Sequence, residues 1–270
     1  MAAGKYANVN GLNMYYEVYG KGQPLLLLHG GFGTISMFDA ILPTLAENRQ
    51  AIGVEWQGHG HTADIDRPFS FEQLADDVAA LINHLKLENA DLLGYSLGGG
   101  VALQTAIRHP DLIRRLVVVS APCKSDGWYA EVHAGQKSIH AESAKAWVGS
   151  PMHQAYVSVA PKPDDWIQFV AKASRMVGQD YDWSKDPASI KAPMMIAVGD
   201  ADAVRPAHAV EFFELRGGGQ REAGWDRSGM PNARLAILPG ITHYDIITSP
   251  ALAEAVISFL DAPMPERNRP

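Results

Sequence analysis

The chain has 270 residues, of which 47% are hydrophobic, and it carries a formal net charge of −7. This composition excludes a disordered, collagen-like or coiled-coil chain and supplies one large core with room for a small insertion. Acidic and basic residues are interspersed without a basic stripe, which argues against a nucleic-acid partner, and one cysteine, Cys123, excludes an internal disulfide and fits a reducing cytoplasm.

We expect no targeting signal at the start of this sequence. Residues 1–10 lack the basic start and apolar core of a signal peptide, and no apolar run approaches the roughly 18 residues of a membrane span. We therefore expect a soluble, cytoplasmic protein with no membrane partner. Val9 and residues 12–19 then alternate apolar and polar side chains around Asn10-Gly11, which predicts a β-hairpin.

Strands of the buried type alternate with helices through the first half of the chain. The run Leu25–Leu28 suits a strand that is buried on both faces, and it leads into His29-Gly30-Gly31-Phe32-Gly33. This glycine-rich loop exposes backbone N–H groups that can bind an anion. The other elements expected here are a helix over 35–47, a strand over 51–56, a helix over 71–85 with Ser70 as its N-cap, and strands over 91–94 and 116–120.

The alternation stops between residues 122 and 191, where helical patterns are interrupted by prolines. We expect this segment to be a helical cap over the carboxyl ends of the strands, where open α/β sheets bind ligands. It contains four of the six tryptophans: Trp128, Trp147, Trp166 and Trp183. Together with Tyr95 they are candidates for substrate binding, although packing of the cap onto the core would account for about half of the tryptophans.

The alternation resumes after the cap. The expected elements are strands over 193–198 and 234–238, helices over 207–215 and 250–260, and a polar surface excursion over 216–232. This order predicts an α/β fold with a mostly parallel, eight-stranded sheet and helices on both faces. We divide the chain into a core of residues 1–121 and 192–262, a cap of residues 122–191, and a disordered tail of residues 263–270.

One stretch combines a buried strand, a tight turn and a helix start. It reads Gly94-Tyr95-Ser96-Leu97-Gly98-Gly99-Gly100, in which G-x-S-x-G has the spacing of a nucleophile elbow. A serine at such a turn adopts a strained backbone, and small residues two positions before and after it allow close approach of the chain. Three glycines weaken a helix start, so a packing or functional demand explains them.

A serine hydroxyl needs a base and a carboxylate to become a nucleophile. Asp202 follows the strand that ends at Val198, and His243 follows the strand that ends at Leu238. Both side chains are therefore expected at the same edge of the sheet as Ser96. Asp200, two residues earlier, is an alternative carboxylate on the same loop.

Five motifs resemble the α/β-hydrolase superfamily, of the kind with a helical cap between the sixth and seventh strands. They are His29-Gly30-Gly31-Phe32-Gly33, Gly58-His59-Gly60, Gly94-Tyr95-Ser96-Leu97-Gly98-Gly99, Gly199-Asp200-Ala201-Asp202 with Val204 and Pro206, and Gly240-Ile241-Thr242-His243. The resemblance implies Ser96 as the nucleophile, His243 as the general base and then acid, and Asp202 as the carboxylate. The family pattern of Gly-x-x-Asp followed by proline selects Asp202 over Asp200.

The same resemblance implies an oxyanion hole and no cofactor. One donor is the backbone N–H of Leu97, and the second comes from Gly31 or Phe32, of which we prefer Phe32. Such donors are typically worth about 3 kcal/mol each in the transition state. Many members have an aspartate where this chain has Glu55 before Trp56, which we interpret as altered loop packing.

Two further groups of residues invite other chemistry. His59, His61 and Asp64 suggest a metal, but the zinc-hydrolase pattern needs further histidines nearby and a different fold, so no metal is expected. No histidine is expected to pair with Cys123, so we interpret this residue as a small apolar side chain and not as a nucleophile.

The predicted function is a serine carboxylesterase for a small hydrophobic ester, with pyrethroid-type esters among the candidates. The alternatives are a lactonase of the acyl-homoserine type, a carbon–carbon bond hydrolase, a perhydrolase, and a small-molecule receptor of the same fold. A carbon–carbon hydrolase would need a cation for a substrate carboxylate, for which Lys124 and Arg175 are candidates. Serine at the elbow disfavours dehalogenase and epoxide hydrolase activity, and the sequence indicates no oligomeric state.

Overall fold

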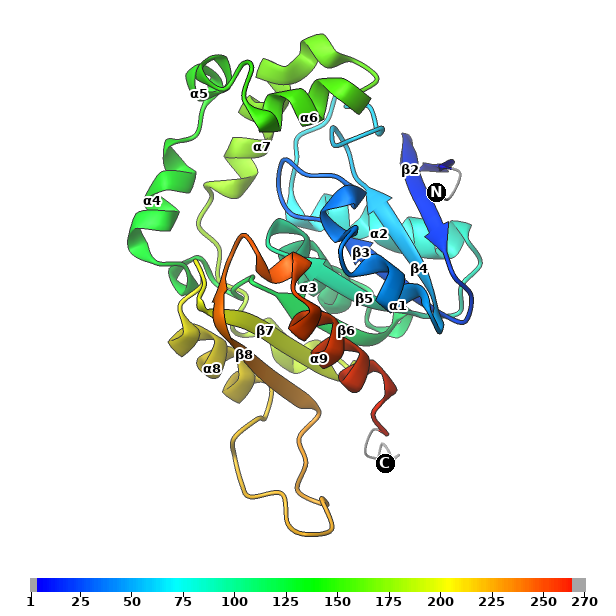
Figure 1. The fold of residues 1–270 in the computed structure, drawn as a ribbon, viewed down its shortest axis with the longest axis vertical. Helices are drawn as coiled ribbons and strands as arrows, with labels where there is room; N and C mark the ends of the chain where they lie inside the picture. The colour runs from blue at the N-terminus through cyan, green and yellow to red at the C-terminus, as the bar shows by residue number, and fades with distance from the viewer. Residues whose placement is uncertain (1–3, 264–270) are drawn as a thin grey trace.

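The predicted fold class is confirmed by a computed structural model, which describes residues 4–263. Its eight-stranded sheet has the order β1-β2-β4-β3-β5-β6-β7-β8 (Figure 1). The strands are β1 (Lys5–Val9), β2 (Leu12–Tyr19), β3 (Gln23–Leu28), β4 (Arg49–Glu55), β5 (Ala90–Tyr95), β6 (Ile113–Val119), β7 (Met194–Ala201) and β8 (Ala233–Thr242). The predicted tail lies outside the described residues, apart from Pro263.

Most of the sheet is parallel, as expected. The hairpin β1-β2 and the pair β2-β4 are antiparallel, whereas β4, β3, β5, β6, β7 and β8 run parallel to one another. Alternate residues of β3 enter different cores: Leu26 and Leu28 belong to one apolar cluster, and Leu25 and Leu27 belong to the other. The uninterrupted leucine run therefore reflects burial on both faces.

Helices cover both faces of the sheet. The core helices and 3-10 turns are η1 (Ile35–Phe38), α1 (Leu42–Ala46), α2 (Phe71–His84), α3 (Leu97–Arg108), η2 (Pro110–Leu112), α8 (Pro206–Leu215), η6 (Ile246–Thr248) and α9 (Pro250–Asp261). Apolar residues of α2, α3 and α8 join one core cluster, and those of α1 and α9 join the other. Ser70 caps α2 by accepting a hydrogen bond from Gln73 N–H, as predicted.

The helix predicted over residues 35–47 is interrupted. A 3-10 turn, η1, is followed after a short break by α1. Pro43 occupies the first turn of α1, where its missing N–H costs no hydrogen bond. A proline further inside a continuous helix would remove one, so the chain restarts the helix just before it.

The segment between β6 and β7, which we call the insertion (residues 122–191), is mainly helical and lies above the carboxyl ends of the strands in Figure 1. Its elements are η3 (Ser125–Gly127), α4 (Ala130–Ser138), α5 (Ala141–Ala146), α6 (Pro151–Val159), η4 (Pro163–Asp165), α7 (Trp166–Val177) and η5 (Asp186–Ser189). The chain near its two ends is joined by backbone contacts. Lys124 and Asp182 form an isolated antiparallel β-bridge, and Trp183 N–H donates to Cys123 O.

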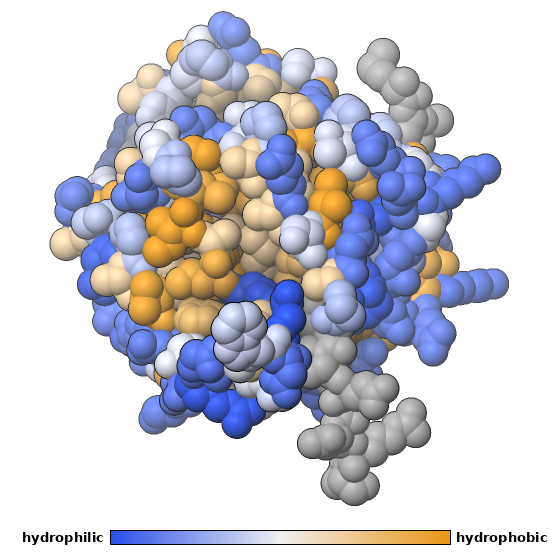
Figure 2. Space-filling model, turned by 60° about the horizontal axis from the view of Figure 1, so that its bottom comes forward, coloured by the Kyte–Doolittle hydropathy of each residue, from blue (hydrophilic) through white to orange (hydrophobic). Residues whose placement is uncertain are grey.

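The side of the molecule away from the insertion carries a mixed surface. Figure 2, in which the lower side of Figure 1 comes forward, shows hydrophobic side chains gathered in one area among hydrophilic ones. Exposed hydrophobic residues of the described chain include Leu215, Trp225 and Ile237. Among residues 4–263, no helix has both the length and the apolar composition needed to cross a bilayer.

Candidate active site

Ser96 lies at the sharp turn between β5 and α3. Its backbone has φ 54° and ψ −121°, a conformation that non-glycine residues rarely adopt. Ser96 N–H donates to Val119 O at 2.9 Å, and Ser96 O accepts from Gly99 N–H at 2.8 Å, so the turn is held at both ends. The strain is typical of a functional position because the surrounding structure has to enforce it.

The glycines around Ser96 are sterically required. A Cβ at Gly94 would be 2.1 Å from Gly98 O, and a Cβ at Gly98 would be 2.2 Å from Leu28 O. At Gly99 and Gly100 a Cβ would come within 2.5 Å of a neighbouring side chain. The packing demand expected from the sequence is therefore present at all of these positions.

The side chains of Ser96, His243 and Asp202 form a hydrogen-bonded series. Ser96 Oγ is 3.1 Å from His243 Nε2, and His243 Nδ1 is 2.9 Å from Asp202 Oδ1. Because a carboxylate can only accept, Nδ1 carries the proton and Nε2 is free to accept the serine hydrogen. This is the arrangement in which a serine hydroxyl can become a nucleophile.

Asp202 is buried and accepts several hydrogen bonds. Besides His243, it accepts from Ser120 Oγ, from Gly199 N–H at 3.1 Å and from Val204 N–H at 3.0 Å. Burial alone would raise its pKa, but the hydrogen bonds from His243 and its other partners outweigh this effect and hold the pKa of Asp202 below its usual value. Asp202 therefore stays ionised behind the imidazole.

Of the two other polar residues near Asp202, Ser120 contacts its carboxylate and Asp200 does not contact His243. Asp200 is exposed and accepts from Gly240 N–H at 2.8 Å, so it braces the end of β8 and does not face His243. Ser120 was not among the predicted residues. It directly follows β6 with φ 51°, and its only signal in the sequence is a polar residue at the end of a buried strand.

Tyr95 and Trp128 both contact His243. Tyr95 is buried, and its hydroxyl donates to His243 O at 2.7 Å, so it fixes the backbone of the histidine loop from below. Trp128 stands edge to face against the His243 ring, with centroids 5.6 Å apart. Tyr95 and Trp128 are two of the five predicted substrate-binding residues; Tyr95 holds His243 through its hydroxyl group, and Trp128 packs against the imidazole.

The glycine-rich loop brings its backbone close to the residue after Ser96. A Cβ built on Gly31 would be 3.7 Å from Leu97 Cβ, so these two backbones are neighbours. Within the described chain, no hydrogen bond uses the N–H of Gly31, Phe32 or Leu97. Gly31 therefore lies beside Leu97, and Phe32, the donor that we preferred, has φ 59° and a ring that contacts Trp147, so either remains a candidate for the second donor.

The remaining tryptophans divide between the two roles considered. Trp147 is half-buried and packs on Phe32, with ring centroids 6.0 Å apart, so it faces the glycine-rich loop. Trp166 is buried inside the insertion, where its Nε1 donates to Ala144 O at 2.9 Å. Trp183 stacks on Tyr181 at 4.2 Å and also contacts Phe71. Trp166 and Trp183 therefore pack the insertion, which is the alternative role that the sequence left open for about half of the tryptophans.

The residues that suggested a metal are each held by a different partner. His59 Nδ1 donates to Gln57 O, and His61 Nδ1 lies 2.9 Å from Glu55 Oε2. Asp64 forms an ion pair with Lys172. In residues 4–263, no three His, Cys, Asp or Glu side chains are grouped so that they could hold a metal. Glu55 also accepts from Ile35 N–H at 3.3 Å, so it orders the loop around it.

Cys123 does have a histidine neighbour, contrary to expectation. Its Sγ is 3.7 Å from His208 Nε2, and its backbone N–H donates to the same nitrogen at 3.2 Å. His208 comes from α8, a contact between distant segments that no sequence motif indicates. Burial raises the pKa of the Cys123 thiol to about 12, so the sulfur stays protonated and fits a packing role.

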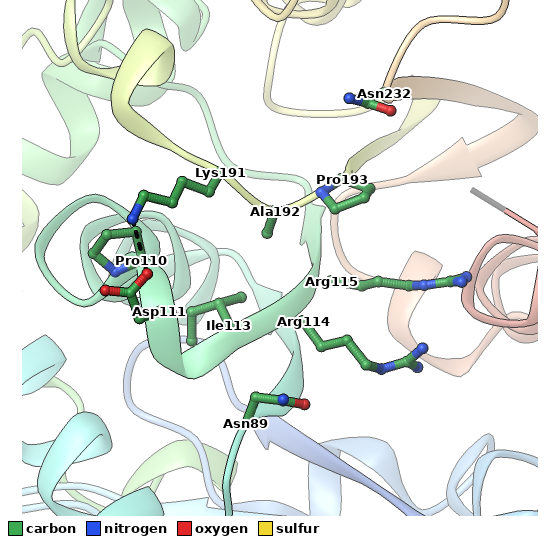
Figure 3. Close-up of a pocket in the computed structure, with 10 residues that line it drawn as sticks. All are labelled: Asn89, Pro110, Asp111, Ile113, Arg114, Arg115, Lys191, Ala192, Pro193 and Asn232. Atoms are coloured by element: carbon green, nitrogen blue, oxygen red, sulfur yellow. Dashed lines mark hydrogen bonds and ion pairs between the residues drawn. The ribbon is translucent and has the colours of Figure 1, made fainter. Parts of the chain in front are cut away.

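A cavity of about 390 Å³ lies at the amino ends of β6 and β7, away from Ser96 (Figure 3). Three cations line it, and each is held by a neighbour. Lys191 forms an ion pair with Asp111, Arg114 forms one with Asp91, and Arg115 donates to carbonyls at the end of α9. None of the predicted site residues lines this cavity, so these cations join structural elements.

Comparison with known proteins agrees with this fold. The family model for the alpha/beta hydrolase fold matches residues 23–136. A putative carbamate hydrolase, RutD, from Azorhizobium caulinodans is 23% identical over 94% of this chain and 97% of its own length. A 2-hydroxymuconate semialdehyde hydrolase from a Pseudomonas species is 35% identical over 38% of each chain.

Solved structures superpose over almost the whole chain. The enol-lactonase from Burkholderia xenovorans has a TM-score of 0.71 and 22% identity, covering 95% of this chain and 100% of its own. The carboxylesterase CesB from Bacillus subtilis has a TM-score of 0.72 and 19% identity, covering 98% and 93%. At these identities the likeness shows the fold, and several activities share it.

Proposed function

Because the chain belongs to the α/β-hydrolase superfamily, we propose that it is a serine hydrolase that cleaves hydrophobic carboxylic esters through an acyl-enzyme. The observation that carries this proposal is the hydrogen-bonded series from Ser96 through His243 to Asp202, at 3.1 Å and 2.9 Å. Each member lies at the carboxyl end of a different strand, and Ser96 is held at a strained turn.

The proposed reaction has two halves. Ser96 Oγ attacks the ester carbonyl as His243 Nε2 takes its proton, and the N–H groups of Leu97 and Gly31 stabilise the tetrahedral oxyanion. His243 then gives the proton to the leaving alcohol. Water, activated by the same imidazole, hydrolyses the acyl-enzyme, and Ser96 is restored.

The surroundings of the series favour an uncharged substrate. Aromatic rings of Phe32, Trp128 and Trp147 lie around the loop and the imidazole. Burial of an apolar acyl or alcohol group against such rings contributes binding energy.

The cations needed by a carbon–carbon bond hydrolase are placed elsewhere. Lys124 forms ion pairs with Glu211 at 2.7 Å and with Asp126 at 3.5 Å. Arg175 lines a surface depression on the insertion together with Lys137 and His140. Neither candidate is therefore available for a substrate carboxylate beside Ser96, which supports the ester over a diketone-type acid.

Replacement of the nucleophile tests the proposal. Ser96→Ala is assayed on a short aryl ester beside Ser138→Ala, a matched exposed serine on α4. We expect Ser96→Ala to lose at least about a thousandfold in kcat and to escape labelling by a fluorophosphonate, and Ser138→Ala to match wild type. Hydrolysis by Ser96→Ala within about tenfold of wild type would overturn the role of Ser96.

The substrate range is measured on the active protein. A panel of aryl esters, esters of increasing chain length, bulky pyrethroid-type esters and acyl-homoserine lactones compares kcat/KM values. A lactone is an internal ester and uses the same residues, so preference for lactones would redefine the substrate and keep the mechanism. Tight binding of small molecules without labelling at Ser96 would instead indicate a receptor.

A further inference from the structure

Three aromatic side chains form a closed cluster beneath the glycine-rich loop. His29 starts the loop after β3, Trp56 follows β4, and His59 lies in the next turn. The ring centroids are 4.0 Å apart for His29 and Trp56, 5.3 Å for the two histidines, and 5.7 Å for Trp56 and His59. Their exposures are 0%, 0% and 2%, so bulk solvent does not reach them.

Each of these rings has one polar atom without a protein partner. His29 Nε2, Trp56 Nε1 and His59 Nε2 are buried, and no group in residues 4–263 hydrogen-bonds to them. A buried polar atom without a partner costs about 1–3 kcal/mol, and three in one cluster are rare. They therefore indicate a polar occupant of this cluster.

The hydrogen bonds on the other side of each imidazole determine what that occupant must offer. His29 Nδ1 is 2.7 Å from Gly30 O, and His59 Nδ1 is 3.0 Å from Gln57 O. A carbonyl can only accept, so both Nδ1 atoms carry protons. Burial lowers the pKa of both rings, to about 4 for His59, so the rings are neutral and both Nε2 atoms are acceptors.

We propose that one buried water molecule binds among His29, Trp56 and His59, donating to the two Nε2 atoms and accepting from Trp56 Nε1–H. Water has two donors and can accept, so it satisfies all three atoms at once, and three hydrogen bonds are usual for a buried water. A metal cation could take the two imidazoles, but it would leave the indole N–H without an acceptor. Water is therefore the occupant that fits.

The site connects to the predicted oxyanion hole through His29. Gly30 O accepts from His29 Nδ1 and also from Gly33 N–H at 3.3 Å. In a trans peptide the C=O and the following N–H point in opposite directions, so fixing Gly30 O fixes the direction of Gly31 N–H. The water makes His29 a positioning residue for that donor, a consequence that rests on the proposed function.

The insertion closes the site. The ring of Phe169, on α7, stands edge to face against His59 with centroids 4.8 Å apart, and it also contacts Phe32 at 5.8 Å. Phe169 itself is buried. One side chain of the insertion therefore touches both the turn below the water and the loop above it, so the water is enclosed when α7 is seated.

A crystal structure at atomic resolution tests the water directly. We expect a solvent peak without anomalous signal about 2.7–3.2 Å from all three nitrogens. Nitrogen-15 spectra of the histidine rings should show the Nδ1-protonated tautomer at both residues. Absence of the peak, an anomalous metal peak, or an Nε2-protonated tautomer at either ring would overturn the proposal.

Kinetics tests the positioning role. Trp56→Phe removes the indole N–H and is compared with Trp225→Phe, the same substitution at a fully exposed position. We expect Trp56→Phe to lower kcat about tenfold with little change in KM, since a loosened oxyanion donor acts mainly in the transition state, and Trp225→Phe to match wild type. Unchanged kcat in folded Trp56→Phe would overturn the positioning role.

The two proposals can fail separately. The crystallographic and NMR measurements need no catalytic activity, so they test the water even if no ester is hydrolysed. Conversely, full activity of Ser96→Ala would overturn the proposed function without moving the solvent peak. A Trp56→Phe protein that does not fold is replaced by His59→Gln, for which the same loss of kcat is expected.

Discussion

Ser120 donates its hydroxyl hydrogen to Oδ2 of Asp202, the carboxylate oxygen that does not face His243. The carboxylate is thereby held between the side chains of His243, at Oδ1, and Ser120, at Oδ2. Ser120 comes from the end of β6, a strand that contributes no member of the series itself. The sheet therefore orients Asp202 from a neighbouring strand as well as from its own loop.

Ser120→Ala tests this orientation. The variant leaves Asp202 with its bonds to backbone N–H groups and His243, so the carboxylate can still ionise but can rotate. We expect kcat to fall about ten- to a hundredfold with KM little changed, because a loss of about 1.5–3 kcal/mol is typical for a hydrogen bond to a charged group. Ser138→Ala is the control for a serine on the surface, and equal kcat values in the two variants would contradict the role of Ser120.

Gly98→Ala tests the steric demand beside Ser96. The added Cβ would lie 2.2 Å from Leu28 O, a backbone atom of β3 that cannot move without disturbing the sheet. We expect a loss of more than about 3 kcal/mol in the free energy of unfolding. The control is Gly135→Ala in α4, where nothing lies within 4 Å of the new Cβ. That variant should gain up to about 1 kcal/mol, since alanine favours a helix. Thermal unfolding compares the two.

Lys172→Met tests how the insertion is fastened to the core. Lys172 Nζ, on α7, donates to both carboxylate oxygens of Asp64 and to Ile65 O at 2.7–2.8 Å. We expect urea unfolding to show a loss of about 1–3 kcal/mol, because this pair is largely buried. Lys145→Met, which breaks an exposed pair with Glu142, should stay within about 0.5 kcal/mol of wild type. Similar losses of unfolding free energy in both variants would contradict a specific role of the Lys172–Asp64 pair in fastening the insertion.

The sequence predicted the members of the series because strand ends determine their place. Residues that directly follow parallel strands must meet at one edge of the sheet, so element order placed Ser96, His243 and the loop of Asp200 and Asp202 together. The choice of Asp202 over Asp200 came from the resemblance to the family pattern. Gly94 and Gly98 were predictable for a similar reason, since the turn that carries the serine leaves no room for a side chain.

Contacts that depend on side-chain packing could not be predicted. Whether Trp147 or Trp166 faces the loop depends on how α5 to α7 pack together, and helical periodicity does not contain that information. The meeting of Cys123 with His208 joins segments 85 residues apart without a motif. The unpartnered nitrogens of the buried cluster arise only when three separate turns are brought together.

The two carboxylates of the β7 loop differ in geometry, and Asp202→Asn compared with Asp200→Asn tests which one acts. Only Asp202 contacts His243, so its replacement removes the acceptor that selects the imidazole tautomer. We expect Asp202→Asn to lose about 10³- to 10⁴-fold in kcat and Asp200→Asn to lose less than about threefold. The reverse ranking would assign the role to Asp200.

The pH dependence of stability provides an independent measurement on Asp202. Its pKa is lowered in the folded protein, because the hydrogen bonds from His243, Ser120 and the backbone outweigh the effect of burial. As the pH falls, Asp202 in the unfolded chain therefore binds its proton near its ordinary pKa of 3.8, at a higher pH than Asp202 in the folded chain. The stability that ionised Asp202 contributes is lost as the pH falls from this value through the folded pKa. Each unit of pKa difference corresponds to about 1.4 kcal/mol.

Asp202→Asn lacks this titration, whereas all other carboxyl groups are shared with wild type and cancel in the comparison. We therefore expect the difference in free energy of unfolding between wild type and Asp202→Asn to be constant above about pH 5 and to shrink in more acidic solution. Ser120→Ala, which removes one of the bonds that lower the pKa, should show a weaker pH dependence than wild type over the same range. Urea titrations at a series of pH values measure all three proteins. A difference that stays constant into acid would mean that the pKa of Asp202 is the same in the folded and unfolded chains.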